Sequence, residues 1–250
     1  MKKSFLLLFT FILSIFSEEI LKESFEYEPG MIFSKNTNRK LVPKWSESVS
    51  NKDRSRWNLT SASALSIDAN QRLTSAESSA SWMTIGLPSL IDKKMIKISL
   101  KVQIGDAKGN KNNPGVSFGL SAKNAPFDIS RKNAADGAQF FYMFNSFKGP
   151  EGHELFHYKV LAGVSESEIN KKISHRNFHM NLEGDLLQIQ MNLKDRTYTA
   201  TFNDEEFDVA NIPAEIQSEN LAYFIIQFSD PVPQSEEDCT WVDDLTIFTE

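Results

Sequence analysis

The most constraining feature of the sequence is a strict alternation of apolar and polar residues in one nine-residue segment. Apolar side chains occupy every second position there: Ile96, Ile98, Leu100, Val102 and Ile104, separated by Lys97, Ser99, Lys101 and Gln103. Successive side chains of a strand point to opposite faces of its sheet, so this pattern predicts a strand with one buried and one solvated face. Antiparallel sheets that cover a core on one side have such strands.

The same period of two returns in many other segments, whereas no segment has apolar residues at helical spacing over a dozen positions. Polar turns separate the strand candidates, which are residues 24–28, 64–67, 81–85, 116–120, 139–147, 156–162, 187–193, 198–202, 207–209, 222–228 and 241–248. Many short strands joined by turns are typical of sandwiches and barrels. The sequence therefore predicts an all-β fold, a two-sheet antiparallel β-sandwich of jelly-roll type.

The last of these strands contains a carboxylate where an apolar residue is expected. Strict alternation places Asp243 on the same face as Trp241, Leu245 and Ile247. A carboxylate that points into a core is costly unless a cation or several N–H groups meet it. Asp243 is therefore expected to have a structural or functional partner.

The first seventeen residues have the pattern of a secretory signal peptide. Lys2 and Lys3 precede an apolar run from Phe5 to Phe16, and Ser17 is a small residue before an acidic pair. The run is short for a membrane span, although an uncleaved N-terminal anchor is the alternative. We expect residues 1–17 to be the signal peptide, residues 18–250 to form a single β-sandwich domain, and the protein to be secreted or periplasmic.

Charge and cysteine content restrict the partners and the sources of stability. The formal net charge is -6, which argues against binding to nucleic acids or to anionic membrane surfaces. Cys239 is the only cysteine, so no disulfide can form within the chain. Stability in an oxidising compartment must then come from packing or from a bound metal.

Three segments together resemble the concanavalin A-like lectin/glucanase superfamily, in particular the laminin G-like and carbohydrate-binding jelly rolls of secreted bacterial proteins. They are the opening from Phe25 to Gly30, the hairpin from Leu186 to Phe207, and the ending from Trp241 to Ile247. The resemblance extends over most of the chain after Ser17 as a pattern, and it implies a fold more directly than an activity.

The resemblance also implies a metal site, because related jelly rolls tie their first and last strands together with a structural Ca²⁺. Glu26, Asp243 and Asp244 could supply oxygen ligands, which a hard cation prefers. The alternative is that Asp243 accepts N–H groups at a bulge or pairs with an arginine.

Carbohydrate binding would use aromatic rings, which stack on the C–H faces of sugars, together with amides that bind hydroxyl groups. The candidate ligand-binding residues are Trp45, Trp57, Trp82, Gln139, Tyr142, Asn145 and His157. The alternative for the aromatic residues is a place in the core.

Motifs for catalysis are weak. The Glu-x-Asp-x-Glu string of laminarinase-type relatives is missing, and the Gln188-Ile189-Gln190 segment lacks the histidine of the similar alginate-lyase element. His157 and Lys159 fall on one face of a strand and are the only candidates for lyase chemistry. We therefore expect a non-enzymatic lectin-like module that binds a glycan or a cell-surface component. The alternatives are a carbohydrate-active enzyme, either a glycoside hydrolase or a polysaccharide lyase, and a structural or adhesive envelope protein.

Overall fold

The computed structural model describes residues 17–31, 33–34, 37–38, 41–59, 65–75, 81–105, 115–125, 138–149, 152–162, 183–229 and 240–250. Residues 1–16 of the expected signal peptide and Cys239 lie outside this part of the chain. Among the described residues, no helix is long and apolar enough to cross a membrane.

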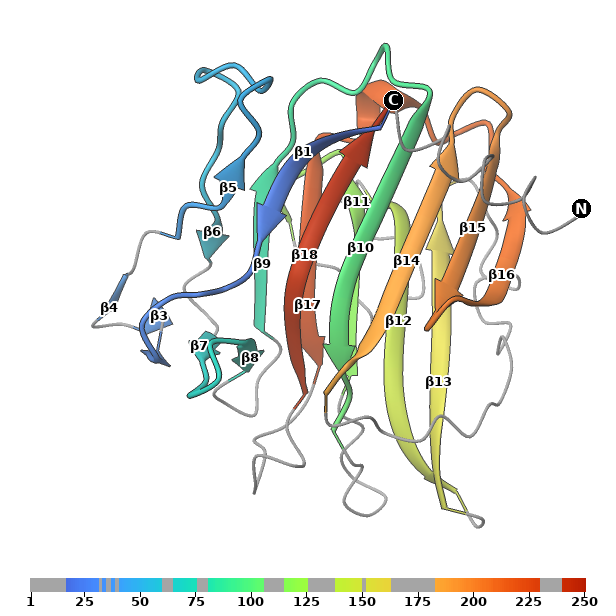
Figure 1. Ribbon diagram of the computed structural model, residues 1–250. Helices are drawn as coiled ribbons and strands as arrows, with labels where there is room; N and C mark the ends of the chain where they lie inside the picture. Colours follow the sequence, from blue (N-terminus) through green and yellow to red (C-terminus); the bar gives the residue numbers. More distant parts are fainter. Residues whose placement is uncertain are drawn as a thin grey trace, which may run out of the picture.

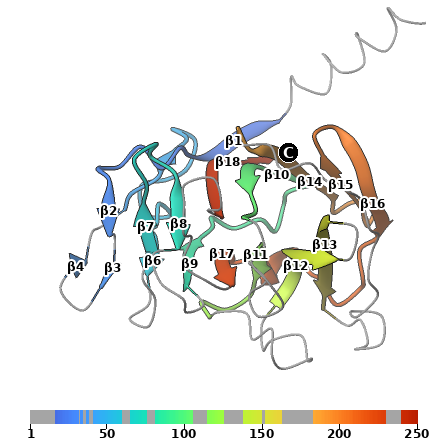
Figure 2. The same cartoon turned by 90° about the horizontal axis from the view of Figure 1, so that it is seen from below.

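Two antiparallel sheets lie one on the other (Figures 1 and 2). The larger sheet has ten strands, with the order β16-β15-β14-β10-β18-β8-β7-β2, while β1 joins β18 to β5. Its strands are β1 (Glu18–Glu23), β2 (Gly30–Met31), β5 (Lys44–Trp45), β7 (Leu65–Ile67), β8 (Leu73–Ser75), β10 (Met95–Gln103), β14 (Asp185–Asn192), β15 (Thr197–Phe202), β16 (Glu205–Asn211) and β18 (Trp241–Thr249).

The smaller sheet has six strands, with the order β13-β12-β11-β17-β9-β6. They are β6 (Asn58–Leu59), β9 (Ser81–Gly86), β11 (Gly115–Ser121), β12 (Ala138–Gly149), β13 (Gly152–Leu161) and β17 (Tyr223–Ser229). A separate pair, β3 (Phe33–Ser34) and β4 (Thr37–Asn38), and one short 3-10 helix, η2 (Ser218–Asn220), complete the described elements. The predicted all-β sandwich is thus confirmed.

The core lies between the sheets and is built by the alternation seen in the sequence. Ile96, Ile98, Leu100 and Val102 of β10 are fully buried or nearly so, and they face Phe118, Phe140, Phe144 and Phe224 of the other sheet within one apolar cluster. Burial of these side chains is the main favourable term in the folding of such a sandwich.

Turn residues and one glycine match their sequence signals. The β14–β15 turn has Arg196 at φ 58, and the β15–β16 turn has Asn203 and Asp204 at φ 50 and 65, conformations that Asn and Asp tolerate well. On β11 a side chain at Gly119 would place its Cβ 2.1 Å from the carbonyl oxygen of Phe140. Gly119 therefore permits the close strand approach that its position in the sequence predicts.

The first strand does not lie where the sequence places it. The alternation around Phe25 predicts a strand over residues 24–28, whereas β1 is Glu18–Glu23 and pairs with β18 and β5. Phe25 has a φ of 50, which a strand cannot accommodate. The chain therefore leaves β1 at Ser24 and turns away from the sheet.

Candidate functional site

A buried carboxylate organises the turn that follows β1. Glu23 is 4% exposed and accepts three hydrogen bonds, from the Phe25 amide at 2.8 Å, the Tyr27 hydroxyl at 2.7 Å and the Trp57 indole N–H at 2.8 Å. Burial raises the pKa of Glu23, and these hydrogen bonds oppose the rise without cancelling it. Glu23 thus holds the Phe25 backbone in its left-handed conformation and also fixes the position of the Trp57 ring.

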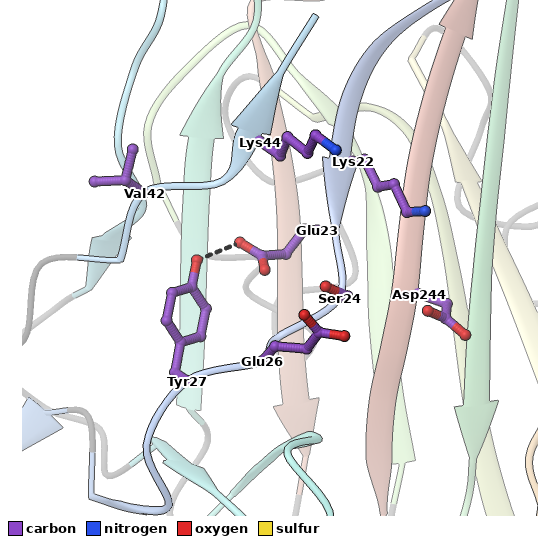
Figure 3. A pocket seen from close by; sticks show the side chains of 8 residues that line it. All are labelled: Lys22, Glu23, Ser24, Glu26, Tyr27, Val42, Lys44 and Asp244. Carbon is purple, nitrogen blue, oxygen red and sulfur yellow. Dashed lines mark hydrogen bonds between the residues drawn. The ribbon is translucent and has the colours of Figure 1, made fainter.

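Next to this turn lies a pocket of about 360 Å³ on the ten-stranded sheet, beside β1 (Figure 3). Strands β1, β5 and β18, the segment after β1 and the residue pair before β5 line it with polar side chains and one aliphatic one: Lys22, Glu23, Ser24, Glu26, Tyr27, Val42, Lys44 and Asp244. Two of the three residues expected to bind a metal, Glu26 and Asp244, meet here. No motif in the sequence marks Glu23, Lys22 or Lys44 as site residues, although Glu23 follows Leu21 at the strand period.

The lining carboxylates differ in what they already bind. Glu23 is occupied by its three donors, and Asp244 forms an ion pair with Lys101 at 3.2 Å between Oδ2 and Nζ. Glu26 is exposed and has no hydrogen bond or ion pair within the described residues. Glu26 is therefore the carboxylate available to a ligand.

Asp243 does not point into the core, so the strict alternation used to place it is wrong for this part of β18. The register between β10 and β18 shifts between Ser99 and Lys101, and Asp244 has a φ of 48, which marks a β-bulge. Lys101 is opposite Asp243, and Val242 is opposite Val102 of the core. The extra residue moves Asp243 to the outer face, where its Oδ1 accepts the Asp244 amide at 2.8 Å.

The bulge also moves Trp241 away from the core face that the sequence predicts for it. The Trp241 indole N–H donates to Gln103 Oε1 at 2.7 Å, and the Arg72 guanidinium lies 4.4 Å from the ring centroid. Leu245 and Ile247, beyond the bulge, remain in the core. Trp241 is thus buried on the outer side of the sheet by Arg72 and Gly184.

No group of three or more His, Cys, Asp or Glu side chains that could hold a metal ion occurs within the described ranges. Glu26 and Asp244 share the pocket, but Asp243 is not among its lining residues. The structural Ca²⁺ expected from these three residues therefore stays a prediction.

Asp243 gives a pH-dependent prediction. Partial burial raises its pKa from the ordinary value of 3.8 to about 6; the Asp244 charge adds to the rise, and the Asp244 amide, Lys101 and Arg72 oppose it. Below pH 4 the carboxyl group is protonated in the folded and the unfolded chain. Between about pH 4 and 6 the unfolded chain has released this proton while the folded chain still holds it, so the free energy of unfolding falls across this window and stays low above pH 6.

We therefore expect Asp243→Asn to be more stable than the wild type at pH 8 and to lose this advantage at pH 4. The asparagine oxygen can still accept the Asp244 amide, so the bulge is retained. Urea unfolding at both pH values measures the difference, and Asp195→Asn in the exposed β14–β15 turn is the matched control. An advantage of Asp243→Asn that is equal at both pH values would contradict the prediction.

Three of the expected sugar-binding aromatic residues are buried. Trp45 is 8% exposed and donates its indole N–H to the Ser55 carbonyl, Trp57 is 5% exposed and donates to Glu23, and Tyr142 is 0% exposed. A ring that stacks on a sugar must expose one face, so the expectation of platforms at these three positions is wrong. The polar surroundings of Trp45 and Trp57 in the sequence reflect short strands and turns around them.

The other expected ligand-binding residues lie on the six-stranded sheet, apart from the pocket. Trp82 on β9 is partly buried and opposite Gln227, Gln139 at the start of β12 is 8% exposed, and Asn145 on β12 is opposite Gly115. His157 on β13 pairs with Phe144, and its side chain lies outside the described part of the structure. The structure therefore does not bring these residues together with the pocket.

A second polar cluster, which the sequence did not predict, joins the two sheets. Asp208 of β16 accepts hydrogen bonds from the hydroxyl groups of Tyr142 (2.6 Å) and Tyr198 (3.0 Å), and from the Lys159 ammonium at 3.0 Å. Lys159 also donates to the Tyr198 hydroxyl at 2.6 Å. We call these four residues the inter-sheet cluster.

The inter-sheet cluster is not arranged for proton abstraction by its tyrosines. Burial raises the pKa of Tyr142 and of Tyr198, and the Asp208 charge adds to both shifts. A phenol with a raised pKa is a poor base near neutral pH. Lys159, which the sequence offered for lyase chemistry, is held by Asp208 and Tyr198, so its geometry supports a structural role.

Comparison with solved structures shows a concanavalin A-like fold. The potassium-bound form of the Emp46p carbohydrate recognition domain has a TM-score of 0.53 at 11% sequence identity, over 76% of this chain and 87% of that chain. The metal-free form of the same domain has a TM-score of 0.50 at 11% identity over the same shares. The sequence matches no family model and none of the curated proteins. The recognition made from the sequence is thus confirmed for the fold.

Proposed function

We propose that this concanavalin A-like sandwich is a secreted, non-enzymatic lectin-like module that binds a glycan in the pocket beside β1. The observation that carries the proposal is the pocket itself, which combines free hydrogen-bonding groups with nonpolar surface. The proposal is supported by the likeness in fold to domains that are named carbohydrate recognition domains.

The pocket lining suits a sugar ring. A sugar presents hydroxyl groups at its rim and C–H groups on its faces. Lys22, Lys44 and Glu26 can bind hydroxyl groups, while the Tyr27 ring and the half-exposed Val42 offer nonpolar contact. A volume of about 360 Å³ is near the lower end of the range for small-molecule pockets, which is roughly 300–1,000 Å³. One sugar unit of a longer glycan would fill it.

Secretion is supported by the charged, apolar and small-residue pattern of the first seventeen residues. The mass of the exported protein tests it: a chain that begins at Glu18 is expected. A full-length chain that stays with the cells would contradict secretion and support the alternative of an uncleaved N-terminal anchor.

Glycan binding is tested on an array of neutral and acidic polysaccharides, with the purified protein in calcium and in EDTA. Glu26→Ala should weaken binding to every hit by tenfold or more, because a charged acceptor for hydroxyl groups is lost, worth roughly 1.5–3 kcal/mol. Glu206→Ala, an exposed glutamate on β16 at the far edge of the sheet, should leave binding unchanged.

Two further results from the same samples would change the proposal. Binding that survives Glu26→Ala would move the site away from the pocket, and no binding to any glycan would reject the function. Release of reducing sugars or unsaturated uronates from a hit would show an enzyme instead. A melting temperature unchanged by EDTA would contradict the prediction of a structural Ca²⁺.

A further inference from the structure

Two lysines on neighbouring strands line the pocket side by side. Lys22 of β1 and Lys44 of β5 are directly opposite in the antiparallel register, and both side chains are exposed and line the pocket. Directly opposite residues of antiparallel strands have Cβ atoms about 4.5–5.5 Å apart, and like charges there repel each other. Figure 3 shows the Lys44 side chain extending from β5 toward β1, and the Lys22 side chain extending from β1 toward β18, in the same direction across the sheet.

Neither ammonium group is neutralised by a residue of the described ranges. No hydrogen bond or ion pair joins Lys22 or Lys44 to any residue of the described ranges, although Glu26, Glu23 and Asp244 line the same pocket. Glu23 is occupied by its three internal donors, and Asp244 is paired with Lys101. The groups left to bind a ligand directly are therefore two ammonium groups and the Glu26 carboxylate, while the Glu23 carboxylate adds a negative charge to the pocket wall because its donors are neutral.

The local balance differs from that of the whole chain. The formal net charge of -6 disfavours the approach of an anion from a distance. Salt screens charges more than about 8 Å away at physiological ionic strength. The groups of the pocket that have no partner among the described residues therefore determine which ligand charge is attracted at contact. An anion between Lys22 and Lys44 would remove their mutual repulsion and form two charge-assisted hydrogen bonds.

We infer that the pocket selects an acidic sugar, with the carboxylate or sulfate group held between Lys22 and Lys44 and a ring hydroxyl group held by Glu26. The inference rests on the proposed glycan-binding function and deepens it. Lys22 and Lys44 determine specificity for the acidic group, whereas Glu26 contributes to the binding of acidic and neutral sugars alike.

The test compares three matched ligands by calorimetry on the full-length mature protein: methyl glucuronoside, glucose 6-sulfate and methyl glucoside. At least one acidic ligand should bind ten times more tightly than the neutral one, or better, and the preference should fall as NaCl is raised from 50 to 500 mM, which are test conditions that span strong and weak screening. The carboxylate and sulfate arms show which acidic group fits.

Variants separate the inference from the function on which it rests. Lys22→Gln and Lys44→Gln should each abolish the preference by lowering the affinity for the acidic ligand tenfold or more, while the affinity for methyl glucoside falls far less, because the Gln amide can still donate to a hydroxyl group. Both variants should fold, since their side chains are exposed. Lys194→Gln, in the exposed β14–β15 turn, is the control.

Equal affinity for acidic and neutral ligands, or a preference that survives both lysine substitutions, would overturn the inference and leave glycan binding in place. Binding of none of the three ligands, nor of any glycan on the array, would overturn both.

Discussion

Glu23→Ala should destabilise the protein by about 3–5 kcal/mol, because each buried donor left without an acceptor costs roughly 1–3 kcal/mol. The Phe25 amide, the Tyr27 hydroxyl and the Trp57 indole N–H all lose their acceptor in this variant. Chemical denaturation followed by tryptophan fluorescence measures the loss and also reports on the surroundings of Trp57.

Two variants test the cause. Glu23→Gln keeps one acceptor oxygen but places an NH₂ group against a donor, so a smaller loss of about 1–2 kcal/mol is expected. Glu26→Ala, three residues further on and exposed, should change stability by less than about 0.5 kcal/mol. If Glu23→Ala and Glu26→Ala were equally mild, the turn after β1 would not depend on the buried carboxylate.

Asp208→Ala should destabilise the protein by about 3–5 kcal/mol, the usual cost of removing one partner of a buried ion pair. The side chain of Asp208 is 8% exposed and that of Lys159 is 20% exposed, so water can replace the lost carboxylate only in part. The hydroxyl groups of Tyr142 and Tyr198 lose their acceptor in the same variant. Thermal and urea unfolding measure the effect.

A double variant distinguishes lost packing from an uncompensated charge. Asp208→Leu with Lys159→Met removes both charges, and it should recover most of the stability lost in Asp208→Leu alone, because no ammonium group is then left unpaired. A double variant as unstable as the sum of the two single variants would show that the two charges contribute independently.

The strand pattern was predictable wherever a strand was long enough to show its period. Ile96 to Ile104 became β10, Leu187 to Leu193 became β14, and the polar turn at Lys194 connects β14 to β15. Strands of two or three residues, such as β5 and β8, are too short to show an alternation. Only their pairing partners reveal them.

Two errors share one physical cause, a residue with a positive φ that interrupts the period. Phe25 ends the extended chain inside a segment that alternates, and Asp244 inserts a bulge that changes the face of Asp243 and Trp241. The period of two assigns faces only while every residue stays extended. Neither Phe25 nor Asp244 is of a residue type, such as glycine, from which a positive φ would be predicted.

The candidate site was predictable only in part, because strands distant in sequence assemble it. Glu26 and Asp244 were expected together near the chain ends, and they do line one pocket. Lys22 and Lys44 are brought together only by the pairing of β1 with β5, which the sequence does not show. The inter-sheet cluster draws one polar residue from each of β12, β13, β15 and β16, and no single strand signals it.

The pairing of β1 with β18 has a topological consequence for engineering. Glu18 is opposite Thr249, so the first and last strands of the sandwich finish side by side, as Figure 1 shows. A short peptide could join these ends, and the exposed β14–β15 turn could then be opened, which would give a circular permutant with every strand pairing kept. The order in which the strands are synthesised can thus be separated from the order in which they lie.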